Sequence, residues 1–177
     1  MKNIIEKKLV LVTGGCGFIG SHIVDRLVSD GYVVVVLDDL STGSIDNLNK
    51  EAIFYQGDVS DQLFVNKVFD QHPISYVVHQ ATKININALH EDPLRDVRSS
   101  IDSTIILAGN CVKHKVKKLI YASSVAVYGR AEELPALESS LLEPIYSYGI
   151  AKCSAESYLK YYSIYYDLDY QILRYAN

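Results

Sequence analysis

Residues 13–20 are Thr13-Gly14-Gly15-Cys16-Gly17-Phe18-Ile19-Gly20, and they connect an apolar run, 8–13, to a segment with helical apolar spacing, 18–30. Glycine recurs every three residues, at Gly14, Gly17 and Gly20, and the stretch also fits G-x-G-x-x-G from residue 15. In a strand–loop–helix unit that binds a dinucleotide, glycine allows a tight turn, close approach of the backbone to a pyrophosphate, and close packing of the helix on the strand. The free N–H groups at the start of the helix favour an anion. The pattern predicts a phosphate-binding loop; taken alone, the glycines also fit a flexible turn.

Apolar strands alternate with helical patterns along the rest of the chain. The expected strands cover residues 8–13, 32–37, 52–56, 74–79, 117–122 and 170–175. The expected helices cover residues 18–30, 60–72, 93–115 and 146–167. This alternation implies right-handed crossovers and an open parallel sheet. We therefore predict a doubly wound (Rossmann) α/β fold, with helices on both faces of the sheet and one domain over residues 1–177.

The composition excludes several other classes of protein. The net charge of −4 comes without a basic block, which argues against nucleic acid as a partner. No apolar stretch is long enough to span a bilayer, and the first residues lack the features of a signal peptide. The three cysteines (Cys16, Cys111 and Cys153) form no C-x-x-C pair, and the five histidines suggest no metal site. A cytoplasmic protein without metal and without a membrane partner is expected.

Asp38 follows the second expected strand directly, where a carboxylate accepts hydrogen bonds from the adenosine ribose of a dinucleotide. A 2′-phosphate at this place would meet two like charges, Asp38 and Asp39, with no arginine nearby in the sequence. We therefore predict NAD as the cofactor in preference to NADP. For Asp39 itself, a direct contact with the cofactor and a solvated loop carboxylate remain equally open.

A possible catalytic pair is formed by Tyr148 and Lys152, which lie four residues apart near the start of a helix and therefore share one helix face. A free phenol has a pKa near 10, and lowering it by about three units requires about 4 kcal/mol of differential stabilisation. A neighbouring ammonium and a cationic nicotinamide would both favour the phenolate. Ser124 follows the fifth strand, at the edge where parallel sheets bind ligands. The alternative is packing, since the chain has 14 tyrosines.

Other polar residues are expected to be structural. His79 is interpreted as an imidazole packed under the cofactor, Cys16 as a small loop filler, and Ser123 as a strand-end hydroxyl bonded to the backbone. The tyrosines of the last helix are expected to bury a helix face or to form a dimer contact: Tyr158, Tyr161, Tyr162, Tyr165 and Tyr166.

Six motifs in register resemble the NAD-dependent epimerase/dehydratase family, and the resemblance extends nearly from end to end. The motifs are residues 11–22 (LVTGGCGFIGSH), 37–43 (LDDLSTG), 57–59 (GDV), 122–129 (ASSVAVYG), 148–152 (YGIAK) and 173–177 (LRYAN). Within the family, the resemblance is to nucleotide-sugar 4-epimerases of the UDP-glucose type.

The resemblance implies a role for each matching residue. Residues that would bind NAD are Gly14, Gly17, Phe18, Ile19, Gly20, Asp38, Asp39, Leu40, Ser41, Thr42, Gly43, Asp58, Val59, Gln80, Ala81, Thr82, Tyr148, Lys152 and Tyr175. Those that would contact the sugar nucleotide are Ser124, Val125, Tyr148 and Asn177. The catalytic residues would be Ser124, the base Tyr148, and Lys152, which bridges the base and the nicotinamide ribose. Ser100 stands where the family usually has Asn, an exchange that would loosen a buried hydrogen-bond network.

Dehydratases of this family carry Asp-Glu after the catalytic hydroxyl residue, whereas Val125 and Ala126 follow Ser124 here. The resemblance therefore favours 4-epimerisation over dehydration. In the implied mechanism Tyr148 takes the proton of the sugar 4-hydroxyl as hydride moves to NAD, the 4-keto sugar rotates, and hydride returns to the other face.

Family members continue for more than a hundred residues beyond the position of Asn177, adding a lobe that grips the substrate. The expected substrate is a UDP-linked sugar, and family members are commonly homodimers. Two alternatives remain: a truncated, non-catalytic NAD-binding module, and another nucleotide-sugar oxidoreductase on the same scaffold, such as a 4-keto reductase.

Overall fold

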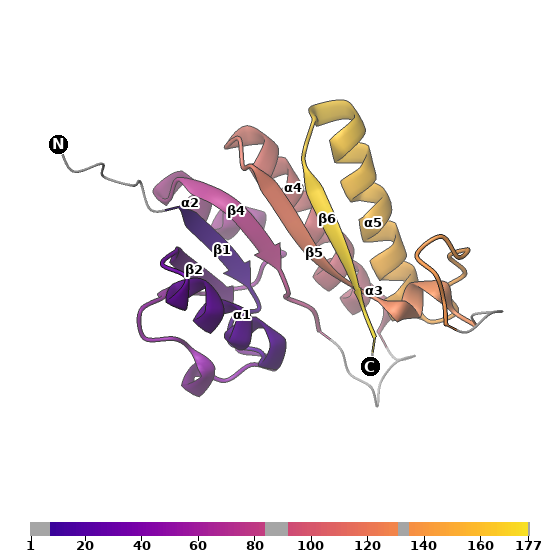
Figure 1. Cartoon of the computed structure of the whole chain (residues 1–177), viewed down its shortest axis with the longest axis horizontal. Helices are drawn as coiled ribbons and strands as arrows, with labels where there is room; N and C mark the ends of the chain where they lie inside the picture. Colours follow the sequence, from indigo (N-terminus) through magenta and orange to yellow (C-terminus); the bar gives the residue numbers. More distant parts are fainter. Residues whose placement is uncertain (1–7, 84–91, 131–134, 177) are drawn as a thin grey trace.

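The computed structural model describes residues 8–83, 92–130 and 135–176. Six strands form one parallel sheet in the order β3-β2-β1-β4-β5-β6. The strands are β1 (Leu9–Thr13), β2 (Val33–Asp38), β3 (Ile53–Gln56), β4 (Ile74–His79), β5 (Lys118–Ser124) and β6 (Tyr170–Tyr175). The order reverses between β1 and β4, the switch point at which such sheets bind ligands. The predicted doubly wound fold is confirmed (Figure 1).

Helices cover both faces of the sheet (Figure 1). One face carries α1 (Phe18–Ser29) over the valines of β1 and β2. The other carries α2 (Gln62–Gln71), α4 (Ser103–Lys113) and α5 (Ser147–Tyr166). Because β1 and β2 lie between two helical layers, their side chains are apolar on both faces, as the nearly continuous valine run predicts.

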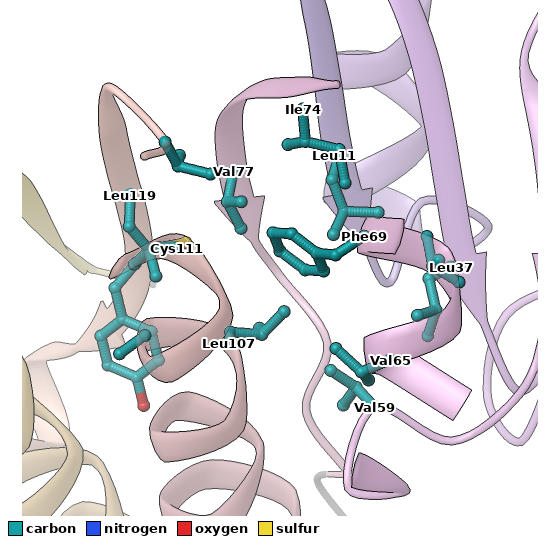
Figure 2. Close-up of a cluster of buried hydrophobic side chains, with 14 of the residues drawn as sticks. Leu11, Leu37, Val59, Val65, Phe69, Ile74, Val77, Leu107, Cys111 and Leu119 are labelled. Atoms are coloured by element: carbon teal, nitrogen blue, oxygen red, sulfur yellow. The ribbon is translucent and has the colours of Figure 1, made fainter. Parts of the chain in front are cut away.

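The main hydrophobic core lies between the sheet and the α2–α4–α5 layer (Figure 2). Phe69 of α2 projects toward the strand residues Leu11 and Val77, and Leu107 of α4 lies beside it (Figure 2). Burying side chains of this size contributes roughly 1.5–3 kcal/mol each. This core holds the carboxyl ends of the strands in a fixed arrangement, and the site described below is built on those ends.

The single long helix predicted over residues 93–115 is interrupted. It consists of α3 (Pro93–Asp96), a π-helical turn η3 (Val97–Asp102) and α4. Two hydroxyls bond back to carbonyls four residues earlier, Ser103 to Ser99 at 2.7 Å and Thr104 to Ser100 at 2.6 Å. Such bonds compete with the regular helical ladder and bend helices. The hydroxyl residues Ser103 and Thr104 therefore mark a real irregularity in this helix.

The expectation that the tyrosines of α5 bury a helix face is wrong for most of them. Tyr162 packs against the main core, whereas four others lie exposed along the second half of the helix: Tyr158, Tyr161, Tyr165 and Tyr166. Ring contacts join Tyr161 to Tyr165 and to Tyr166. The other expectation, a dimer contact, stays a prediction.

Candidate functional site

The glycine loop follows β1 and turns tightly before α1. Gly14 has a φ of +69° and donates its N–H to the Leu37 carbonyl at 2.8 Å. A Cβ on Gly14 would lie 2.7 Å from the backbone nitrogen of Ala81, and a Cβ on Gly20 would collide with the Gly14 carbonyl oxygen. Since Gly17 is the N-cap of α1 and has no side chain, no side-chain cap covers the first N–H groups of the helix. The loop therefore presents bare backbone at a helix N-terminus.

Asp38 lies buried at the end of β2 and faces this loop. Its Oδ2 accepts a hydrogen bond from the Cys16 N–H at 2.9 Å, and its Oδ1 accepts one from the Leu40 N–H at the same distance. The loop after β2 also packs on the glycine loop, because the Ser44 N–H donates to the Cys16 carbonyl at 3.1 Å. The structure thus brings together residues 38–43 and residues 14–20, which the sequence assigned to one cofactor site.

Lys83 joins two carboxylates at the ends of neighbouring strands. Its Nζ lies 2.7 Å from Oδ2 of Asp39 and 2.9 Å from Oδ2 of Asp58. Partial burial acts to raise the pKa of each carboxyl, but hydrogen bonds from Lys83 and from a neighbouring serine hold both pKa values below the usual range. Asp39 is therefore an ion-paired group. Val59, which directly follows Asp58, was also predicted to bind NAD; its side chain is buried in the main core.

His79, at the end of β4, is fully enclosed in a chain of hydrogen bonds. Ser103 donates to the Ser99 carbonyl, so its oxygen accepts from His79 Nε2–H at 3.1 Å. His79 Nδ1 then accepts from the Thr13 hydroxyl at 2.7 Å, and Thr13 Oγ1 accepts from the Ala81 N–H at 3.2 Å. Burial, together with the nearby Lys152 charge, lowers the pKa of His79 to about 3. This neutral tautomer fits the structural role expected from the sequence.

Gln80, Ala81 and Thr82 follow β4 at the switch point. The Gln80 side-chain amide donates to the hydroxyl of Tyr175 at 3.1 Å, which links the ends of β4 and β6 across the intervening end of β5. The hydroxyl oxygen of Thr82 is buried and forms no hydrogen bond within the described residues. Asn177, predicted to contact the sugar nucleotide, lies outside the described residues.

The three predicted catalytic residues are brought together at the carboxyl end of β5. Ser124 ends the strand and caps the following 3-10 turn η4 (Val125–Tyr128), where its hydroxyl accepts from the Ala126 N–H at 3.2 Å. The Ser124 side chain also lies near enough to the phenol of Tyr148 to act on its pKa. Lys152 lies one turn further along α5, and its Nζ is 5.7 Å from the centre of the Tyr148 ring. Val125, a predicted substrate contact, is partly exposed beside Ser124.

The expected lowering of the Tyr148 pKa is not found in the protein alone. Burial raises the pKa of the phenol above its usual value; the nearby Ser124 hydroxyl acts to lower this pKa, and the nearby Asp96 acts to raise it. Burial also lowers the pKa of Lys152 to about 7, although Glu156 opposes this shift. Burial is the largest influence on the pKa of both groups, because a charge loses more by leaving water than it gains from one neighbour.

The assignment of Ser123 to a backbone hydrogen bond is wrong. Its hydroxyl donates instead to Oε1 of Glu156 at 2.5 Å, and Arg174 of β6 pairs with the same carboxylate.

For Cys16 the expected role as a filler agrees with the structure, since the side chain is buried. Burial raises the pKa of the Cys16 thiol to about 11, and Asp38 adds to the effect. A thiol held in this form is a poor nucleophile.

Residues 8–83, 92–130 and 135–176 contain no group of three or more His, Cys, Asp or Glu side chains that could hold a metal ion. Within those same ranges no helix is long and apolar enough to cross a membrane.

Four residues of this region were not predicted from the sequence: Lys83, Glu156, Arg174 and Asp96. Lys83 directly follows the predicted cofactor residues 80–82, so its position was a usable signal. Glu156 continues the four-residue spacing of Tyr148 and Lys152, which also marks it. Asp96 gave no signal, because its approach to Tyr148 depends on how α3 packs against α5.

These features define a class of protein. A dinucleotide fits four of them. They are the parallel sheet in the order 3-2-1-4-5-6, a glycine loop in which an added Cβ would collide, an uncapped helix N-terminus, and a buried carboxylate at the end of β2. The residues present therefore suit NAD, and the protein is a dinucleotide-binding α/β domain with a Ser–Tyr–Lys cluster near the switch point of the sheet.

Comparison with known proteins narrows this class. Residues 10–177 match the model of the NAD dependent epimerase/dehydratase family. A putative UDP-glucose 4-epimerase from Methanocaldococcus jannaschii is 39% identical over 96% of this chain and 55% of its own length. A structure of UDP-glucose 4-epimerase with UDP-glucose from Thermotoga maritima superposes with a TM-score of 0.91 at 41% identity, over 96% of this chain and 55% of that one. A structure of UDP-glucose 4-epimerase from Brucella ovis in complex with NAD superposes with a TM-score of 0.91 at 36% identity, over 96% of this chain and 52% of that one.

The chain belongs to the NAD dependent epimerase/dehydratase family. This confirms the family resemblance and the prediction of NAD as the cofactor. The chain spans about half the length of the relatives that it matches, 55% in the M. jannaschii protein.

Proposed function

We propose that this chain carries the NAD-binding and proton-transfer half of a nucleotide-sugar 4-epimerase acting on a UDP-linked sugar. The observation that carries the proposal is the convergence of Ser124, Tyr148 and Lys152 at the carboxyl end of β5, beside the switch point of the sheet. The epimerases matched over nearly the whole chain support the same reaction class.

The cofactor would lie across the switch point, with its diphosphate on the glycine loop and its adenosine toward Asp38. Asp38 would accept the ribose hydroxyls, while Phe18 and Ile19, both exposed at the start of α1, would cover the diphosphate. When bound, NAD supplies the hydride acceptor for oxidation at C4 of the sugar. Asp38 and the nearby Asp39 favour a ribose without a 2′-phosphate, so NAD binds in preference to NADP.

The chain's own residues would manage the proton. Tyr148 would take the proton of the sugar 4-hydroxyl, and Ser124 would hydrogen-bond the same oxygen as a transient 4-keto sugar forms. Because burial raises the pKa of Tyr148 in the protein alone, the phenol becomes an effective base only when positive charge arrives. The cationic nicotinamide ring is the source of that charge, and it adds to the charge of Lys152, whose pKa burial lowers to about 7.

We further infer a homodimer and a cytoplasmic location. The exposed tyrosines of α5, together with Ile164, form an apolar surface suited to a second copy of the same helix. The cysteines Cys16, Cys111 and Cys153 are all free, as in a reducing compartment.

The test compares Tyr148→Phe with Tyr165→Phe, an exposed tyrosine on the same helix. NAD and NADP affinities are measured by calorimetry, and conversion of UDP-galactose to UDP-glucose by a coupled assay. We expect the wild-type chain to bind NAD and to turn over, Tyr148→Phe to bind NAD with turnover reduced at least about 100-fold, and Tyr165→Phe to resemble wild type. Loss of turnover in both variants would refute the role of Tyr148. NAD binding without turnover in the wild type would identify a non-catalytic module instead, and absence of NAD binding would refute the whole proposal.

A further inference from the structure

Three residues on one face of α5 lie against three consecutive residues at the end of β5. Tyr148, Lys152 and Glu156 are spaced four residues apart, so their side chains lie one above another. Tyr148 lies near Ser124, Lys152 Nζ donates to the Ala122 carbonyl at 2.9 Å, and Glu156 accepts from Ser123 at 2.5 Å. The third contact has no assigned role in the proposed chemistry, although it adjoins both of the others.

The Glu156 carboxylate is the meeting point of several elements. Arg174 of β6 binds it through two hydrogen bonds, from Nε to Oε1 at 3.1 Å and from Nη2 to Oε2 at 2.7 Å. The same guanidinium donates to the Tyr128 hydroxyl at 2.7 Å and to the Glu138 carbonyl at 3.2 Å. Through Glu156 and Arg174, α5 is tied to β5, to β6, to the turn after Ser124 and to the loop beyond it.

A buried ion pair of this kind is not explained by stability alone. Glu156 is 6% exposed, and taking a carboxylate out of water costs several kcal/mol, which a paired cation only partly offsets. Apolar residues of similar volume often stabilise such places equally well. What an apolar residue cannot do is specify direction, whereas a bidentate arginine–carboxylate pair fixes both distance and orientation.

We propose that Glu156 is a positioning residue for the Tyr148–Lys152 pair, holding α5 at the rotation and height against β5 at which Tyr148 reaches Ser124 and Lys152 reaches the Ala122 carbonyl. This inference rests on the proposed function, because it assigns a purpose to the geometry of that same site. Glu156 touches neither substrate nor cofactor; it acts through its neighbours.

The negative charge of Glu156 has a second consequence for Lys152. The titratable groups around the Lys152 ammonium are His79 of β4, Tyr121 of β5, and Tyr148 and Glu156 of α5. Glu156 is the one group in this set that carries negative charge at neutral pH, since burial holds His79 neutral and both tyrosines protonated. Without that charge the ammonium form of Lys152 loses its support.

The test is direct titration of Lys152 in the whole chain with ¹³C-labelled lysine, followed by NMR. The Lys152 resonance is assigned from its loss in Lys152→Arg. Glu156→Gln keeps the size of the side chain and an oxygen that accepts from Ser123, and Glu138→Gln is the control, since only the backbone carbonyl of Glu138 joins the network. We expect the titration midpoint of Lys152 to fall by about one pH unit or more in Glu156→Gln and to stay unchanged in the control. If Glu156→Gln does not fold, Glu156→Asp takes its place, because it keeps the charge but shortens the reach to Ser123. In Glu156→Asp the titration midpoint of Lys152 should shift by less than about half a pH unit. The kcat should fall, whereas KM should stay unchanged.

An unchanged midpoint in folded Glu156→Gln, or an unchanged kcat in Glu156→Asp, would overturn the proposal. The NMR titration needs no turnover. It therefore reports on Glu156 even if the wild-type chain proves inactive, which would count against the proposed function alone.

Discussion

Nζ of Lys83 lies 2.7 Å from Oδ2 of Asp39, so a cation from the segment after β4 is held at the end of β2. The same ammonium pairs with Asp58 at the end of β3. The carboxyl ends of β2 and β3 therefore bring together three carboxylates, counting Asp38, and one cation that balances part of their charge. Without Lys83, an anionic dinucleotide would meet an uncompensated negative surface.

Replacing Lys83 with Met should weaken NAD binding without unfolding the protein. One unit charge several ångströms from a diphosphate, at an effective dielectric constant of about 20, is worth roughly 1–2 kcal/mol, so the Kd for NAD should rise about tenfold. The partly exposed ion pairs themselves should contribute less than about 1 kcal/mol to the free energy of unfolding. Calorimetry at low and high salt measures the first effect, and urea unfolding the second.

Lys118→Met is the matched control for this prediction. Lys118 pairs with Asp169 at 3.2 Å at the amino end of β5, the edge of the sheet opposite to the carboxyl ends where Lys83 lies. Its replacement should leave the Kd for NAD unchanged. Equal weakening in the two variants would mean that net charge, and not the position of Lys83, determines affinity.

Gly20→Ala should damage both fold and binding, because the added Cβ would overlap the Gly14 carbonyl oxygen. Relief requires the glycine loop to move away from α1, at a cost of about 2 kcal/mol or more in the free energy of unfolding. Gly109→Ala is the control, also within a helix, where the Cβ would lie at an ordinary 3.5 Å from the Tyr162 hydroxyl oxygen. There the better helix propensity of alanine should give a gain of up to about 1 kcal/mol. Thermal unfolding of both variants gives the comparison; a Gly20→Ala protein as stable as wild type would contradict the described packing.

Tyr165→Glu should disrupt the proposed homodimer. Tyr165 is 70% exposed near the end of α5, and a carboxylate placed there would be desolvated in a paired helix face. We expect sedimentation velocity to show a dimer for the wild type and a dimer dissociation constant raised at least about tenfold for the variant. Leu63→Glu, on the exposed side of α2, should leave the dimer intact. A wild-type protein that sediments as a monomer at tens of micromolar would end this proposal.

The fold could be predicted because its determinants are local. The valine run of β2, the apolar spacing of α1 and the left-handed Gly31 that ends the helix are readable within a few residues. The π-helical turn η3 was not predicted, because hydroxyls that bond to carbonyls four residues earlier occur in regular helices too, and η3 also packs against α5.

The site was predictable where a motif is contiguous and unpredictable where partners come from distant segments. Asp38 and the glycine loop, or Tyr148 and Lys152, are recognisable by their spacing. The bond between Ser123 and Glu156 links residues 33 positions apart, and nothing in the local sequence distinguishes it from a backbone bond. The direction of the Tyr148 pKa shift was missed for a related reason: burial is a property of the whole fold, and it is the largest influence on the pKa of this phenol.

Acid should destabilise this protein through His79. The pKa of the folded imidazole, about 3, is below the value of 6.5 that applies when the chain is unfolded, so between these limits the unfolded state binds the extra proton. The contribution of neutral His79 to the free energy of unfolding is therefore fully present above pH 6.5 and is lost as the pH falls toward 3. The slope of this loss approaches roughly 1.4 kcal/mol per pH unit, which is the limit for one titrating group. Asp39 and Asp58, whose pKa values are lowered, add to the loss only below about pH 4.

Urea unfolding between about pH 7.5 and 4.5 should show this slope in the wild type and in His22→Gln, an exposed histidine, but not in His79→Gln. The amide introduced by His79→Gln can still donate to Ser103, so the variant should fold, with lower stability than the wild type at neutral pH. A slope that persists in His79→Gln would show that some other group takes up the proton.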